Sequence, residues 1–92
     1  MKITIHYLAQ LKRLAGVASE QLEVPSGSTL AGLLTQLAQT RSGLLASVML
    51  DERSQPQPAL LVFVGEEQIR QPAEQLLNEG DQVTLLAPMA GG

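Results

Sequence analysis

The stretch Ser-Thr-Leu-Ala-Gly-Leu-Leu-Thr-Gln-Leu-Ala, residues 28–38, decides the fold of this chain. Its apolar side chains recur at i, i+3, i+4, i+7 and i+8, the spacing that places them on one face of an α-helix. They are Leu30, Leu33, Leu34, Leu37 and Ala38. Ser28 is the predicted N-cap, because its hydroxyl can accept a hydrogen bond from a free amide of the first turn. The pattern predicts one main amphipathic helix.

Segments with strand patterns lie before this helix. Residues 2–7 and 19–24 alternate apolar and polar side chains, which is the period-two pattern of strands with one buried face. Between them, residues 8–16 predict a short helical turn that Gly16 closes, because glycine adopts the left-handed conformation without steric cost. We expect the two strands to pair as a hairpin.

The chain after the helix begins with a surface excursion at residues 41–58, in which a weak apolar pattern at 44–49 is compatible with further helical turns. Residues 60–64 form an unbroken apolar run, typical of a strand that is covered on both faces near the middle of a sheet. The remaining pattern predicts an edge strand at 66–70, a helical turn at 72–77, a tight turn at 78–81 and a last strand at 82–86.

This order of elements predicts an α+β fold with one main helix packed across a mixed sheet. We expect a single domain at residues 1–86, followed by a tail at residues 87–92. The predicted core combines the inward positions of the helix and the strands. These are Ile3, Ile5, Leu22, Val24, Leu30, Leu33, Leu34, Leu37, Val62, Val64, Val83 and Leu85.

The composition is that of a compact globular protein. The 92 residues are 45% hydrophobic and 16% charged, which suits one domain with one core. A net charge of −3 and two aromatic residues, Tyr7 and Phe63, argue against binding to nucleic acid or to an anionic membrane. The strand-like start lacks the pattern of a signal peptide, and no apolar run is as long as a membrane span, so we expect a cytoplasmic protein.

Groups that could carry catalysis or hold a metal ion are sparse. The sequence has no cysteine, and its single histidine, His6, falls on the polar side of the first strand, where we expect it to face solvent. The adjacent carboxylates at 51–52 and 66–67 lie in loop-like contexts and are expected to be solvated. No glycine-rich nucleotide-binding motif occurs. We expect this chain to be no enzyme and to have no metal site.

The unusual feature is the C-terminal segment Pro88-Met89-Ala90-Gly91-Gly92. Two residues without a Cβ make a thin chain that can take conformations closed to other residues. Such a tail can pass through a narrow channel and deliver its terminal carboxylate into the active site of another protein. The alternative interpretation is a frayed terminus without a role.

Short motifs over the whole length carry a more specific likeness. They are Tyr7-Leu8-Ala9, Leu11-Lys12-Arg13-Leu14-Ala15-Gly16, Gly27-Ser28-Thr29-Leu30, Val62-Phe63-Val64, Gly80-Asp81-Gln82-Val83 and Pro88-Met89-Ala90-Gly91-Gly92. With these motifs in this order, the chain resembles the ubiquitin-like sulfur-carrier family, which includes the small subunit of molybdopterin synthase and the sulfur carrier of the thiamine pathway. The resemblance implies the β-grasp fold, which agrees with the order of elements.

The resemblance also implies a mechanism. An E1-like adenylyltransferase uses ATP and Mg²⁺ to adenylate the carboxylate of Gly92, with the tail residues before it passing into the active site. A sulfur donor, which is a sulfurtransferase, a desulfurase or sulfide, converts the acyl-adenylate to a thiocarboxylate. An acceptor enzyme, such as the large subunit of molybdopterin synthase, then receives the sulfur. The carrier itself binds no cofactor.

Two departures leave the pathway open. The excursion at 41–58 makes the chain longer than compact members of the family, and the tail has one proline where the molybdopterin subunit often has two. A carrier for thiamine, cysteine or a sulfur-containing secondary metabolite is an alternative. So are a ubiquitin-like modifier conjugated through Gly92 to lysines, and a non-covalent interaction module with an inert tail.

A partner surface is predicted on the sheet face that turns away from the main helix. Strand alternation turns every second side chain of the segments at 60–64 and 82–86 to this face. The expected members are Leu61, Phe63, Thr84 and Leu86. An open apolar patch beside a functional tail favours a docking site for the activating enzyme and the acceptor in turn. The alternative is that the excursion at 41–58 folds over it.

Overall fold

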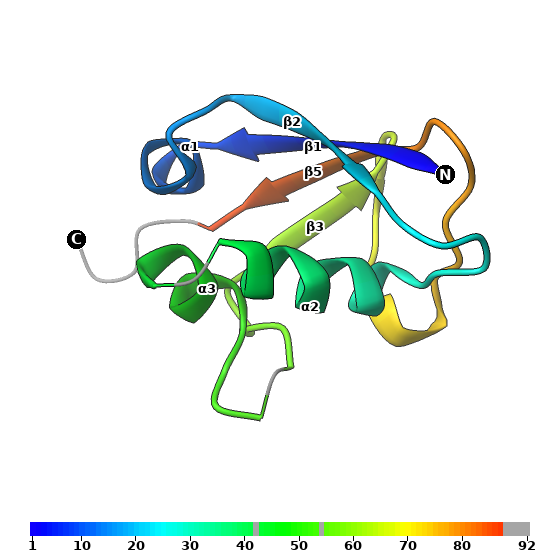
Figure 1. Cartoon of the computed structure of the whole chain (residues 1–92). Coiled ribbons are helices and arrows are strands. Elements are labelled where there is room, and N and C mark those ends of the chain that lie inside the picture. The colour runs from blue at the N-terminus through cyan, green and yellow to red at the C-terminus, as the bar shows by residue number, and fades with distance from the viewer. Residues whose placement is uncertain (42, 54, 88–92) are drawn as a thin grey trace.

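The computed structural model describes residues 1–41, 43–53 and 55–87. In this part of the chain, α2 and α3 pack against one face of a five-stranded sheet (Figure 1). The elements in chain order are β1 (Lys2–Leu8), α1 (Gln10–Ala15), β2 (Ser19–Glu23), α2 (Leu30–Thr40), α3 (Leu44–Met49), β3 (Leu61–Val64), β4 (Glu67–Gln68), the 3₁₀-helix η1 (Pro72–Glu74) and β5 (Gln82–Leu86). The predicted arrangement of one main helix across a mixed sheet is confirmed.

The strands lie in the order β2-β1-β5-β3-β4. β1 and β5 are parallel, and the other neighbours are antiparallel, so the last strand fills the space between two hairpins. The prediction that the apolar run at 60–64 forms a central strand covered on both faces is wrong. β3 is the fourth of the five strands, and Val62 is its one buried residue. Its other apolar side chains are half-buried, because the helices cover only one face of the sheet.

The main helix, α2, forms where the leucine spacing predicts it. Its leucines are fully buried against the sheet, at Leu30, Leu33, Leu34 and Leu37. The N-cap is Thr29 and not the predicted Ser28, because the Thr29 hydroxyl accepts a hydrogen bond from the Gly32 amide at 3.1 Å. The Ser28 hydroxyl instead donates to the Pro25 carbonyl at 2.6 Å, which stabilises the preceding turn.

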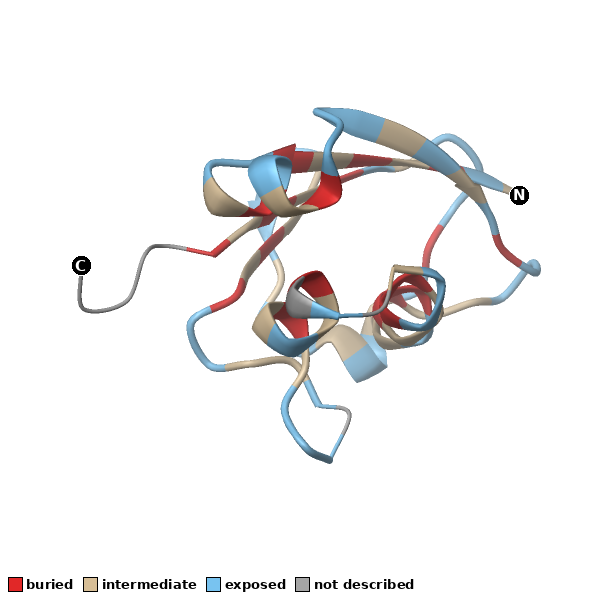
Figure 2. Ribbon diagram, turned by 60° about the vertical axis from the view of Figure 1, so that its left-hand side comes forward, coloured by how far each residue is buried: buried red, intermediate tan, exposed pale blue. Residues whose placement is uncertain are grey.

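The core lies between the sheet and the helices, where buried residues of both layers face one another (Figure 2). Two predicted core residues, Leu22 and Val64, are only half-buried, although both pack against the core. Other buried residues come from β1, the short helices and the connections, and were not predicted. They are Tyr7, Leu11, Ala15, Leu45, Met49, Leu60, Leu77 and Ala87.

The excursion at 41–58 folds beside the helices. Its described part contains α3 and a tight pairing in which Leu50 bridges to Pro56 and the Asp51 amide donates to the Gln55 carbonyl at 2.8 Å. In both views this segment lies on the helix side of the molecule (Figures 1 and 2). The described part of the excursion therefore leaves the opposite face of the sheet open.

Candidate interaction site

The four side chains predicted for a partner surface lie together on the outer face of the sheet. In the antiparallel register of β3 and β5, Leu61 pairs with Leu86 and Phe63 pairs with Thr84. Each of the four is half-buried, whereas the alternate residues of β5 are fully buried under the helices. The two strands thus place three apolar side chains and one threonine side by side at the surface.

Leu8 extends this surface and was missed by the sequence interpretation. It ends β1 beside Leu86 in the parallel register of β1 and β5, and it is 44% exposed. The sequence pattern assigned it to the following helical turn, but the strand continues to this residue. The signal that could have found it is the alternation of β1, which puts Leu8 on the same face as His6. We call Leu8, Leu61, Phe63, Thr84 and Leu86 the outer patch.

His6 lies next to the outer patch, opposite Thr84 in the register of β1 and β5. Its Nε2 is 2.6 Å from Oε1 of Gln82, so the ring is held by a neighbouring amide on the outer face. In the described part of the chain, no group of three or more His, Cys, Asp or Glu side chains is placed to hold a metal ion. His6 and Gln82 thus form a polar edge of the outer patch.

A cluster of three polar side chains joins β1, β2 and the end of α2, and no pattern in the sequence predicts it. The Tyr7 hydroxyl and the Arg41 Nε both donate to the same Glu20 oxygen, Arg41 at 2.6 Å. The Arg41 Nη1 also donates to the Ala15 carbonyl at 2.9 Å, and the guanidinium lies 5.8 Å from the centre of the Tyr7 ring. These bonds fix the end of α1 and the start of β2 relative to α2.

The cluster has the electrostatics of a structural ion pair. The hydrogen bond from Arg41 is the main cause that lowers the pKa of the Glu20 carboxyl. Burial opposes this shift, and the Tyr7 hydroxyl and the charge of Arg41 add smaller lowering effects. Burial raises the pKa of the Tyr7 phenol, and the Glu20 carboxylate adds to the shift. Glu20 is thus kept charged and Tyr7 neutral, which is the opposite of a poised acid and base pair.

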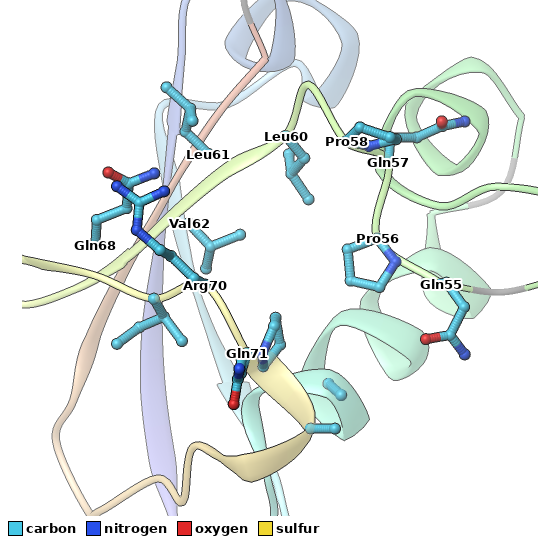
Figure 3. Close-up of a pocket in the computed structure, with 14 residues that line it drawn as sticks. Gln55, Pro56, Gln57, Pro58, Leu60, Leu61, Val62, Gln68, Arg70 and Gln71 are labelled. Carbon is cyan, nitrogen blue, oxygen red and sulfur yellow. The ribbon is translucent and has the colours of Figure 1, made fainter.

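A groove lies between the excursion, the edge of the sheet and η1 (Figure 3). Leu60, Val62 and Pro56 point into it, while Gln68 and Arg70 lie along its border. Arg70 is the one charged residue among the described residues that line it. A groove with a single cation and no carboxylate, histidine or thiol has no pair of groups for acid–base or nucleophilic chemistry.

The C-terminal end of β5 holds the start of the tail. The strand ends at Leu86, a member of the outer patch, and the next residue, Ala87, is buried in the core. The proposed tail residues Pro88, Met89, Ala90 and Gly91 and the carrier residue Gly92 lie outside the described residues. The described chain therefore leads to them from a fixed point beside the patch.

None of the helices in the described part of the chain is long and apolar enough to cross a membrane.

Comparison with known proteins gives one family and several similar structures. The sequence matches the model of the ThiS family over residues 5–92. No match was found among curated proteins. Small archaeal modifier protein 1 from Haloferax volcanii is similar over 100% of both chains, with 20% identity and a TM-score of 0.87.

Two further similar structures come from other organisms. Urm1 from Trypanosoma brucei is 25% identical over 99% of this chain and 95% of its own, with a TM-score of 0.81. A Pyrococcus furiosus protein assigned as subunit 1 of a molybdopterin converting factor is 21% identical over 97% and 99% of the two chains, with a TM-score of 0.75. These likenesses confirm the predicted β-grasp fold.

Proposed function

The chain belongs to the ThiS family, and from this premise we propose that it is a sulfur carrier whose working group is the C-terminal carboxylate of Gly92. At the level of the family, the chain is a sulfur carrier or small modifier of the ubiquitin-like type. Carriers of this family are non-catalytic, bind no cofactor and are activated by an E1-like partner, which confirms the predicted role as a partner of enzymes.

The observation that carries the proposal is the extent of the family match, which includes the terminal Gly91 and Gly92. If the tail had no role, we would expect the family match to end near the last strand and not to extend to residue 92. We propose that residues 1–86 act as the domain and residues 87–92 as the tail, with Ala87 held in the core as its anchor. The thin residues beyond it reach the active site of the partner.

The proposed chemistry has two steps on Gly92. A carboxylate oxygen attacks the α-phosphorus of ATP in the activating enzyme, which forms an acyl-adenylate and releases pyrophosphate. Sulfide, as the simplest sulfur donor, then attacks the acyl carbon, and AMP leaves with the electrons of the broken carbon–oxygen bond. The product is a thiocarboxylate, which is a sulfur nucleophile. Adenylation is required first, because an unactivated carboxylate has no good leaving group for sulfide to displace.

We assign the outer patch to docking of the E1-like enzyme and of the acceptor in turn. Its apolar members Leu8, Leu61, Phe63 and Leu86 are adjacent in the strand register and lie beside the anchored start of the tail. Contiguous apolar side chains are unfavourable when exposed to water, and such patches commonly mark sites where another protein binds. The acceptor we favour is the large subunit of a molybdopterin synthase, and the compartment is the cytoplasm, where ATP-dependent activation takes place.

Intact-mass spectrometry of the protein purified from its own cells tests the proposal. The expected result is a fraction in which one oxygen is replaced by sulfur, located at the C-terminus by fragmentation. A variant that lacks Gly92 is the control and should carry no such exchange. Branched lysine adducts without any thiocarboxylate would favour the modifier instead, and the absence of both products would contradict a covalent role of the tail.

A further inference from the structure

Charges are separated along the length of the sheet, and five carboxylates gather at the end opposite the tail. The amide of Thr4 donates to the carbonyl of Asp81, and that of Gly65 donates to the carbonyl of Gln82, which brings the strand ends together. The carboxylates at these strand ends are Glu23, Glu66, Glu67, Glu79 and Asp81, and all but Asp81 are exposed. The positive groups at this end are the exposed Lys2 and the amino group of Met1, which pairs with Glu23 at 3.6 Å. The five carboxylates outnumber these two cations, so this end of the molecule is acidic.

The end that leads to the tail has the opposite charge. α1 contacts β1 and β5 and lies at the end of the sheet to which both strands run (Figure 1). It carries Lys12 and Arg13 in its last turn. Both side chains are exposed, and neither makes an ion pair with any residue in the described part of the chain. The other cation at this end, Arg41, is balanced by Glu20 at 2.6 Å. Two unbalanced positive charges therefore stand beside the exit of the tail, on a chain whose net charge is −3.

These two cations are part of a shaped, partly apolar surface. A shallow concavity is lined by Lys12, Arg13 and Val17, together with the small residues Ala9, Gly16 and Ala18. Val17 is 39% exposed, and Leu8, the last residue of β1, is 44% exposed. Ala9, which lines the concavity, follows directly after Leu8 of the outer patch, so the basic surface and the apolar surface adjoin along the chain near the end of β5.

We propose that Lys12 and Arg13 form an electrostatic guide that docks the tail end of the carrier onto an acidic rim of the active-site channel in its E1-like enzyme. This inference rests on the proposed function and adds to it the charge of the partner surface. A uniformly acidic carrier would be repelled by such a rim, whereas this separated distribution turns the tail toward it and the acidic end away. Lys12 and Arg13 act by positioning the carrier and take no part in the chemistry.

Steady-state kinetics with the E1-like enzyme of the same organism tests the guide, with the full-length chain as substrate, sulfide present to consume the acyl-adenylate, and pyrophosphate release as the readout. The double variant Lys12→Glu/Arg13→Glu should raise the KM for the carrier about tenfold and leave kcat unchanged, because charges at a rim change association more than the reaction. The double variant Lys12→Gln/Arg13→Gln should give a smaller rise. The dependence of kcat/KM on salt should be weaker in both variants than in the native chain.

Arg53→Glu/Arg70→Glu is the matched control, because it changes the net charge equally through exposed residues away from α1. It should have the KM of the native chain. An unchanged KM for the Lys12 and Arg13 variants, or an equal rise in the control, would overturn the guide while leaving the carrier function intact. A native chain that releases no pyrophosphate would instead overturn the carrier function and the guide together.

Discussion

Arg41 connects three parts of the fold that are far apart in the sequence. Its guanidinium bonds to the Glu20 carboxylate and to the Ala15 carbonyl, and it lies over the Tyr7 ring. Hydrogen bonds to charged groups stabilise more than neutral ones, and removing one partner leaves the others incompletely paired. The side chain therefore joins residues that are far apart in the chain at the end from which the tail leaves.

Replacing Arg41 with alanine should lower the free energy of unfolding by about 1 to 3 kcal/mol at neutral pH. Chemical denaturation monitored by circular dichroism measures the loss. Arg70→Ala is the control, because Arg70 is exposed and makes no ion pair with a described residue, and it should change the stability by less than about 0.5 kcal/mol. Equal losses in the two variants would contradict the role of the cluster.

Glu20 should also give the fold an acid-sensitive component. The pKa of Glu20 in the folded chain is lowered, chiefly by Arg41. The charged carboxylate therefore stabilises the folded chain fully above the ordinary glutamate pKa, and this stabilisation is lost as the pH falls through the lowered pKa. The native chain should therefore lose stability on acidification below about pH 4. Glu20→Gln should be less stable at neutral pH and lack this loss, and an identical acid profile would argue against the assigned cause.

At the scale of elements, the sequence predicts segments that cover two or more periods of their structure better than segments that cover fewer. The leucine spacing finds α2, and alternation finds β1, β2 and β5, because these patterns record which face is buried. α1 and α3 have six residues each, too few to show a period, and their buried residues Leu11 and Met49 depend on contacts with distant parts of the chain. Charge pairs such as Arg41 with Glu20 leave no local pattern at all.

The same limit applies to the candidate site. Alternation correctly places Leu61, Phe63, Thr84 and Leu86 on one face, because the period of a strand is fixed by its geometry. Alternation in β1 places Leu8 on the face of His6, but the order of the strands is not contained in any one segment, so the pairing of Leu8 with Leu86 could not be predicted. The cations of α1 become significant only when the fold places them beside the end of β5.

The burial of α2 can be tested at Leu34, which has no exposed surface. Leu34→Ala should lower the free energy of unfolding by about 2 to 5 kcal/mol, because the cavity left under the sheet cannot close fully. Leu76→Ala is the control, since Leu76 is 62% exposed and should lose less than about 0.5 kcal/mol. A loss under about 1 kcal/mol at Leu34 would mean that the helix face has been assigned incorrectly.

At the scale of the whole molecule, the two faces of the sheet have separate roles. The inner face builds the core with α2 and α3, and the outer face holds apolar side chains that no described segment covers. The parallel pairing of β1 with β5 brings Leu8, Leu86 and the start of the tail to one end of the sheet. Stability and partner binding should therefore respond to different substitutions.

Phe63→Asp and Leu86→Asp should separate these roles. Both side chains are half-buried on the outer face, so a carboxylate there can stay hydrated, and the folded state should survive. At the apolar centre of a binding surface, the same carboxylate should weaken the complexes with the E1-like enzyme and with the acceptor by about tenfold or more. Isothermal titration calorimetry measures the affinity, and thermal unfolding checks the fold.

Leu76→Asp introduces the same charge at an exposed leucine outside the outer patch and should bind both partners normally. Native-like affinity of both patch variants would place the docking surface elsewhere, and an unfolded variant would show that its residue belongs to the core.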